Sequence, residues 1–260
     1  MKAYLFLWNH RRILFATALS DVQARYRGTA LGLGWSIVYP LLFLGLYAII
    51  YLLIFRIRIA EYTTFEYILL IFSGLIPFLG FSEALSTGVT SVLGNKSLIR
   101  NTMFPIELIP VKAVLASTVT MTVGLVVLLA TLWIRGTILP TQAAIPAIFA
   151  LQLIFTIGLI WILAALNVFF QDLGHMLGVI ILFLMLISPI AYTLEMVPPS
   201  LMPLMYPNPL FYMIMLYRGA MVMGDIPMGL LAVFTAISLT TFALGHHVFT
   251  RLKPMFADHV

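Results

Sequence analysis

Long apolar runs without any charge constrain this chain more than any other feature. Residues 28–55 form a run of 28 without a charge, and residues 136–171 form a run of 36. A helix needs about 20 apolar residues to cross the ~30 Å hydrocarbon core of a bilayer. Only 9% of the 260 residues are charged and 62% are hydrophobic, whereas about a quarter are charged in soluble domains. The sequence therefore predicts an all-α integral membrane protein.

Six transmembrane helices fit these runs. Their expected ranges are residues 28–55, 67–93, 113–134, 143–169, 176–192 and 228–249. Lys and Arg are enriched in the cytoplasmic loops of membrane proteins. With the N-terminus inside, ten of the 14 Lys and Arg lie on the cytoplasmic side. Both termini of a multi-pass protein are therefore expected in the cytoplasm.

Two other regions interrupt this pattern within what we interpret as a single domain, residues 1–260. Residues 1–30 combine five basic residues with apolar and aromatic ones, which predicts an amphipathic helix at the membrane interface. Residues 195–227 are apolar but contain six prolines, and interior prolines remove backbone hydrogen bonds that lipid cannot replace. We expect an extracytoplasmic loop there with short re-entrant half-helices, the best of them after Asn208-Pro209.

Residues 94–110 (GNKSLIRNTMFPIELIP) form a short polar interruption between long apolar runs. Apolar anchors recur in it at near-helical spacing, and Pro105 and Pro110 limit any helix to about two turns. Such a segment can present a face to a soluble partner. An ordinary cytoplasmic loop, basic because topology demands it, explains the same residues.

The sequence excludes several kinds of chemistry. It has no cysteine and no G-x-x-x-x-G-K-[ST] phosphate loop, so nucleotide binding through a P-loop is not expected on this chain. We also expect no metal site, because no Asp, Glu and His cluster is visible. Glu83 is the one carboxylate expected at membrane depth, either as a structural group or as a working one. Asp172 and His175 suit a helix cap better than a catalytic pair.

Several motifs, in the same order along the chain, resemble the ABC-2-type polysaccharide export permeases. They are residues 21–36 (DVQARYRGTALGLGWS), 74–78 (GLIPF), 81–85 (FSEAL), 93–99 (LGNKSLI), 104–110 (FPIELIP), Asp172-Leu173, Ser188-Pro189 and the element from Asn208-Pro209 to Arg218-Gly219. The resemblance covers essentially the whole chain and is strongest to the O-antigen exporters, followed by those of capsule and teichoic acid. Ser20 and Gln171 stand where the family often has Arg, so a basic contact is absent at each.

This resemblance implies a non-enzymatic permease subunit of the bacterial inner membrane. It implies a homodimer with one ATP-binding subunit under each copy, and ATP and magnesium bound by that partner only. Its substrate would be a lipid-linked polysaccharide, possible further partners a periplasmic or outer-membrane export component, and nucleic acid is not expected. Residues 94–110 would be the coupling segment, with contacts to the ATPase from Lys96, Ile99, Arg100, Phe104 and Glu107.

Two further sets of residues are candidates for handling the substrate. Arg25 and Arg27 would meet a lipid phosphate, although a purely topological role explains them equally. Tyr39, Phe43, Tyr47 and Tyr51 recur every four residues, so they share one helix face that would line the channel and stack on sugars. Helix packing or lipid contact is the alternative for this face. An ABC-2 exporter of teichoic acid, lipid or drug, or a membrane transferase using Asp172 or His175, remains an alternative function.

Overall fold

The computed structural model describes residues 2–50, 63–96 and 104–256. The described part is all helical and contains no strand, as predicted. Its α-helices are α1 (Lys2–Asn9), α2 (Arg11–Tyr26), α3 (Trp35–Ile49), α4 (Thr64–Val89), α5 (Ser91–Gly94), α7 (Leu108–Ile134), α8 (Ile145–Phe169), α9 (Asp172–Ile187), α10 (Met202–Met205), α11 (Pro209–Arg218) and α12 (Met228–Leu252).

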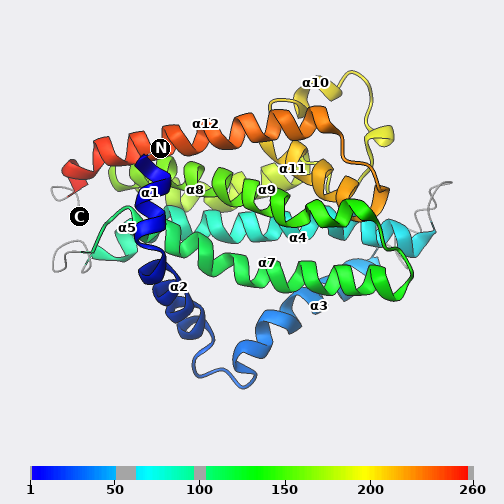
Figure 1. Ribbon diagram of the computed structural model, residues 1–260, viewed down its shortest axis with the longest axis horizontal. Helices are drawn as coiled ribbons and strands as arrows, with labels where there is room; N and C mark the ends of the chain where they lie inside the picture. Colours follow the sequence, from blue (N-terminus) through cyan, green and yellow to red (C-terminus); the bar gives the residue numbers. More distant parts are fainter. Residues whose placement is uncertain (1, 51–62, 97–103, 257–260) are drawn as a thin grey trace.

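Helices α4, α7, α8 and α12 run lengthwise in one bundle, while α1 and α2 cross one of its ends (Figure 1). These four helices, in part with their flanking turns, are long and apolar enough to cross a membrane. The other two predicted spans have shorter counterparts in the described residues, α3 with 15 residues and α9 with 16. The described residues therefore include four helices that qualify as full-length candidate spans.

The start of the first span differs from the prediction. Helix α3 begins at Trp35 rather than at residue 28, because α2 ends at Tyr26 and a turn separates the two helices. Gly28 and Gly32 in this turn have φ values of 80° and 52°, which suit glycine and would strain other residues. The predicted N-terminal helix is likewise divided into α1 and α2, with a break at His10.

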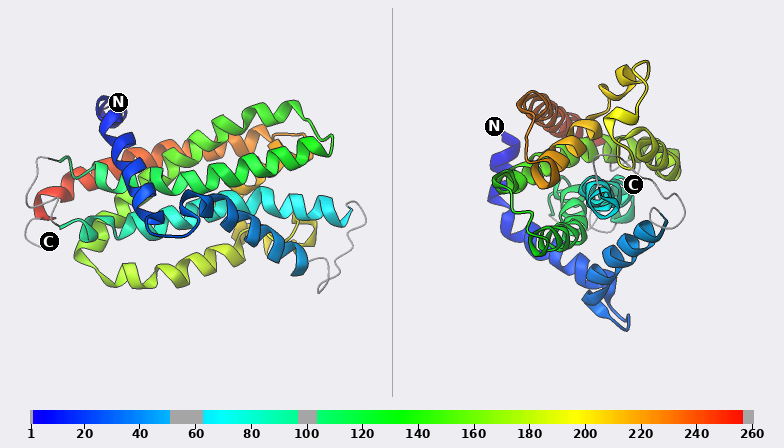
Figure 2. Two further views of the ribbon diagram at one scale, coloured as in Figure 1. Left: turned by 90° about the horizontal axis from the view of Figure 1, so that it is seen from below. Right: turned by 90° about the vertical axis from the view of Figure 1, so that its right-hand side faces the viewer.

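The central helix of the bundle is α4, which other helices surround on all sides in the end-on view of Figure 2. It packs most extensively on α7, and glycines permit this approach. A Cβ atom on Gly80 would lie 2.5 Å from the Met121 sulfur, and one on Gly124 would lie 2.9 Å from the Ile76 side chain. Small residues bring helix backbones close in membrane proteins, where dispersion rather than water drives packing.

The most extensive helix contact joins α8 and α12. A Cβ atom on Gly158 would lie 2.5 Å from the Phe242 backbone, and one on Gly245 would lie 2.1 Å from the Gly158 carbonyl oxygen. The two backbones therefore touch at these glycines. This contact leaves no room for side chains at these positions, so α8 and α12 pack backbone to backbone there.

The proline-rich region forms the predicted short helices. Helix α11 begins where Asn208 accepts a hydrogen bond from the Leu210 amide at 3.0 Å, with Pro209 as its first residue. Arg218, at the end of α11, is 1% exposed and donates to the carbonyl oxygens of Ile190 at 2.7 Å and Tyr192 at 2.9 Å. Helix α11 is thereby fastened to the loop that follows α9.

Candidate substrate cavity and coupling region

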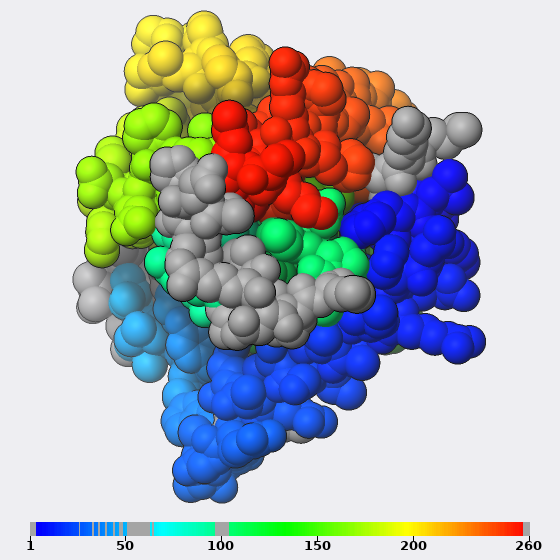
Figure 3. Space-filling view, turned by 90° about the vertical axis from the view of Figure 1, so that its left-hand side faces the viewer, coloured from blue at the N-terminus to red at the C-terminus, as the bar shows by residue number. Residues whose placement is uncertain are grey.

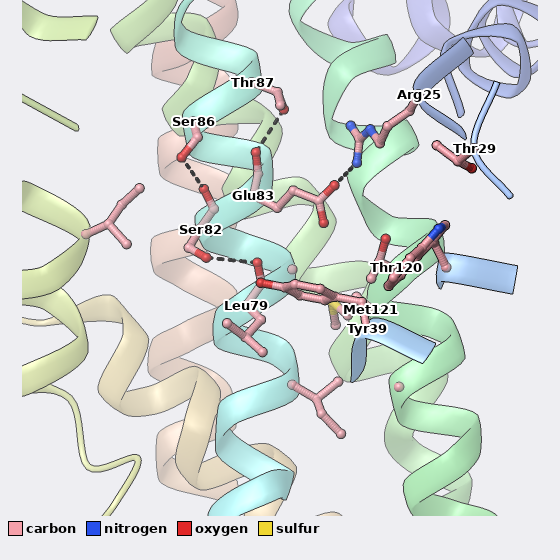
Figure 4. Close-up of a pocket in the computed structure, with 15 residues that line it drawn as sticks. Arg25, Thr29, Tyr39, Leu79, Ser82, Glu83, Ser86, Thr87, Thr120 and Met121 are labelled. Atoms are coloured by element: carbon pink, nitrogen blue, oxygen red, sulfur yellow. Dashed lines mark hydrogen bonds and ion pairs between the residues drawn. The ribbon is translucent and has the colours of Figure 1, made fainter. Parts of the chain in front are cut away.

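A cavity of about 720 Å³ opens between the N-terminal helices and the bundle. Helices α4 and α7 form its inner wall, the α2–α3 region covers it, and Ile181 of α9 reaches its edge. Figure 4 shows Arg25, Glu83, Tyr39 and the hydroxyl residues of α4 around this space. The cavity therefore brings together Arg25, Glu83 and Tyr39, the first residue of the predicted aromatic face.

Arg25 and Glu83 form an ion pair across the cavity (Figure 4). Arg25 lies in the last turn of α2 and Glu83 lies in α4, and their side chains are 32% and 28% exposed. The carboxylate offsets the charge of the guanidinium. Arg27, the second predicted phosphate ligand, is an exposed residue just after α2.

A second ion pair fastens the same helix to the bundle. Asp21 of α2 lies 3.1 Å from the Lys112 Nζ of α7, and the Lys112 side chain is only 10% exposed. Leu14, Ala18 and Val22, at i, i+4 and i+8, are buried on the same helix. Helix α2 therefore presents one apolar face and two charged contacts to the bundle.

The cavity wall is mainly apolar, and five Ser and Thr side chains and two aromatic rings form part of it. The hydroxyls of Ser82, Ser86 and Thr87 donate to carbonyl oxygens of their own helix, at 2.9, 2.9 and 2.8 Å. Their oxygens retain lone pairs that can accept hydrogen bonds. Trp35 and Tyr39 add aromatic surface. Such a wall can bind a sugar weakly, by hydrogen bonds to the sugar hydroxyl groups and by stacking of aromatic rings on the sugar C–H faces.

Two residues of the predicted aromatic face are neighbours in the structure. Tyr39 is 52% exposed and lies 5.9 Å from the Phe43 ring, centroid to centroid, so the two residues do share a face. Tyr47 belongs to α3. Tyr51 lies outside the described residues, and its place on this face stays a prediction.

The predicted coupling segment is described at its two ends. Lys96 lies just after α5, whereas Ile99 and Arg100 lie outside the described residues. Phe104 is half-buried, and Glu107 is 8% exposed and bonds to Lys253 near the end of α12 at 2.8 Å. Helix α7 starts at Leu108, so Pro110 falls in its first turn rather than limiting a separate helix. Glu107, at the end of this segment, therefore has a partner within the described part of the chain.

No group of three or more His, Asp or Glu that could hold a metal ion is found in the described ranges. Asp172 and His175 lie in the first turn of α9, and neither lines the cavity. The structure thus brings Arg25, Glu83 and Tyr39 together and leaves the transferase candidates apart from them.

Comparison with known proteins identifies the family. Residues 14–222 match the ABC-2 type transporters. The chain belongs to the ABC-2 type transporter family. This transporter is 30% identical to the O-antigen export system permease protein RfbA of Klebsiella pneumoniae, over 95% of this chain and 94% of the relative. It is 26% identical to the protein of that name from Myxococcus xanthus, over 98% and 97%, and 26% identical to the polysialic acid transport protein KpsM of Escherichia coli, over 86% and 88%.

Sequence reasoning missed several residues of this ABC-2 transporter. Ser82 and Ser86 stand one helical turn apart in a mainly apolar helix, beside Glu83 and Thr87, and that polar spacing is the signal that could have placed them on the cavity. No comparable pattern in the sequence indicates the ion pairs of Asp21 with Lys112 and of Glu107 with Lys253. Each joins residues far apart in the chain, so only the fold reveals them.

Proposed function

We propose that this ABC-2 transporter is the membrane subunit of an ATP-driven exporter of a lipid-linked polysaccharide, O-antigen-like or capsular. The observation that carries this proposal is the cavity, whose wall combines aromatic rings, hydroxyl oxygens and the Arg25–Glu83 pair. The full-length similarity to O-antigen export permeases, and the weaker similarity to a polysialic acid transport protein, support this substrate class.

The proposed topology places six spans in the bacterial inner membrane with both termini in the cytoplasm. Helix α1 and the end of α12 lie toward the same end of the bundle, which is consistent with an even number of crossings (Figure 1). Ten of the 14 Lys and Arg then face the cytoplasm, as membrane topology favours. Helices α1 and α2 are the interfacial element, and α10 and α11 dip back from the outer side.

A second copy of the chain completes the channel. The cavity opens beside α3 and α9, and both helices carry large exposed apolar side chains there, among them Leu42 at 61%, Val179 at 73% and Phe183 at 61%. A path through which sugars pass must be shielded from lipid tails, which offer no hydrogen bonds. We therefore place α3 and α9 at the seam of a homodimer, with the cavity turned inward.

In this channel the substrate meets two kinds of group. Arg25 and Arg27 bind the phosphate of the lipid carrier, and the phosphate takes the place of Glu83 on Arg25. Tyr39, Phe43, Tyr47 and Tyr51 stack on the sugars, without charges that would trap the polymer. Few charges and repeated aromatic faces allow a long chain to slide.

A separate ABC ATPase supplies the energy, and it binds ATP and magnesium. Residues 94–110 dock on it, with Lys96 and Arg100 setting the register and Ile99 and Phe104 packing into its surface. These residues fit that role because the segment joins the cytoplasmic ends of α5 and α7. The exporter then has two permease copies and two ATPase copies.

Purification from the native membrane tests this function. The tagged protein in mild detergent should bring down a P-loop ATPase in equal amount, identified by mass spectrometry. Charge reversal of Lys96 and Arg100 to Glu should release the ATPase, whereas Glu195→Lys, an exposed charge reversal before α10, should not. Recovery of the wild-type protein without any ATPase in several detergents would refute the proposal.

A further inference from the structure

Glu107 ends the coupling segment and is buried rather than displayed to a partner. Its side chain is 11% exposed, and its Oε1 lies 2.8 Å from the Nζ of Lys253, just beyond α12. The buried Oε2 has no hydrogen-bond partner within the described residues. A buried carboxylate requires a partner, so Lys253 is the group that stabilises Glu107 in this position.

The backbone of the same residue is bound to α8. The Glu107 carbonyl oxygen accepts a hydrogen bond of 2.9 Å from the indole Nε1 of Trp161, whose side chain is fully buried. The Trp161 ring in turn lies 5.2 Å from the Phe242 ring and 5.4 Å from the His246 ring, both on α12. Glu107 is therefore attached to α8 through its backbone and to the end of α12 through its side chain.

Both attachments lead to the closely packed pair of α8 and α12. Helices α8 and α12 touch at Gly158 and Gly245. At the cytoplasmic end, the Phe256 ring lies 5.3 Å from Phe249 and 6.1 Å from Phe169, so it joins α12 to the end of α8. In Figure 3 the end of α12 (red) lies directly beside the green start of the α7 region. A displacement of Glu107 would thus move α8 and α12 together.

On its other side, Glu107 leads directly into the cavity wall. The next residue, Leu108, begins α7, and Lys112 one turn later binds Asp21 of α2. Helix α7 also supplies Thr120, Met121 and Gly124 to the cavity. Glu107 therefore lies at the junction between the α7 side of the cavity and the α8–α12 pair.

We infer that Glu107 and Lys253 are positioning residues that transmit the movement of the coupling segment to the α8–α12 pair. This inference rests on the proposed function, in which residues 94–110 receive the movement of the ATPase. Without the ion pair, only the backbone hydrogen bond from Trp161 joins Glu107 to the α8–α12 pair, and the end of α12 no longer follows the movement. The ATPase then hydrolyses ATP without driving export.

The test uses the full exporter complex in a strain that lacks its own copy of the permease. Glu107→Gln and Lys253→Met should each lower surface polysaccharide at least tenfold, measured on gels of extracted glycan. The purified complexes should keep the ATPase in equal amount and hydrolyse ATP within twofold of wild type. The double variant Glu107→Lys with Lys253→Glu, which restores an ion pair, should return export to within threefold of wild type.

Two further variants make the result decisive. Arg251→Met removes an exposed cation of the same helix end and should export normally. Lys253→Arg keeps the positive charge, so this variant should also export normally. It tests the need for the ion pair even if the double variant does not fold. Normal export by Lys253→Met, loss of the ATPase from that variant, or failure of both Lys253→Arg and the double variant would each overturn the inference. Wild-type complexes without any ATPase would instead refute the proposed function.

Discussion

Replacing Glu83 with Gln should tighten the binding of an anionic lipid to Arg25. The Glu83 carboxylate pairs with the Arg25 guanidinium, and the two side chains are 28% and 32% exposed. Ion pairs with this degree of solvent contact contribute up to about 1 kcal/mol. A phosphate that binds Arg25 must displace Glu83, so its binding free energy is reduced by the contribution of this ion pair. Because about 1.4 kcal/mol corresponds to a factor of ten, Glu83→Gln should raise the affinity about two- to fivefold.

Native mass spectrometry of the purified protein in mild detergent measures this effect. Farnesyl diphosphate is the anionic probe and farnesol is the neutral control. Arg25→Gln should weaken the preference for the diphosphate, because Arg27 alone then remains, and adding Glu83→Gln to it should raise the affinity less than it does in the wild-type protein. Glu195→Gln, an exposed carboxylate outside the cavity, should bind like wild type. Equal or weaker diphosphate binding by Glu83→Gln would refute the displacement of Glu83 by phosphate.

Two other predictions address packing and the channel. Gly158→Ala places a Cβ atom 2.5 Å from the Phe242 backbone, so overpacking should lower the unfolding free energy by about 1–3 kcal/mol, seen as a lower Tm in detergent. In the control variant Gly178→Ala the new Cβ atom meets no other atom within 4 Å, so the Tm should be unchanged or higher. Equal losses of Tm in the two variants would argue against the contact between α8 and α12. A triple variant with Ala at Tyr39, Phe43 and Tyr47 should lower export at least tenfold at normal expression. Normal export by this variant would refute the hypothesis that the aromatic face lines the channel.

The sequence by itself determined the class of the protein and most helix positions. Hydropathy is a local property, and a bilayer demands about 20 apolar residues for each crossing, so the runs that became α4, α7, α8 and α12 were visible directly. The helix that starts at Pro209 was predictable for the same reason, since Asn-Pro is a local start signal. The late start of α3 was not predicted, because apolar residues continue through the turn at Gly28 and Gly32.

Only the tertiary structure decided what the few charged residues do. Asp21 and Lys112 are 91 residues apart, and Glu107 and Lys253 are 146 apart, yet each pair meets at the bundle's end. A single sequence does not reveal which residues far apart in the chain are close in space. A charge in a membrane domain must find a partner or reach water, but several partners satisfy that need equally well. The packing of glycine-lined helices selects among them, and it thereby places Arg25 against Glu83 in the cavity and turns Glu107 inward toward α12.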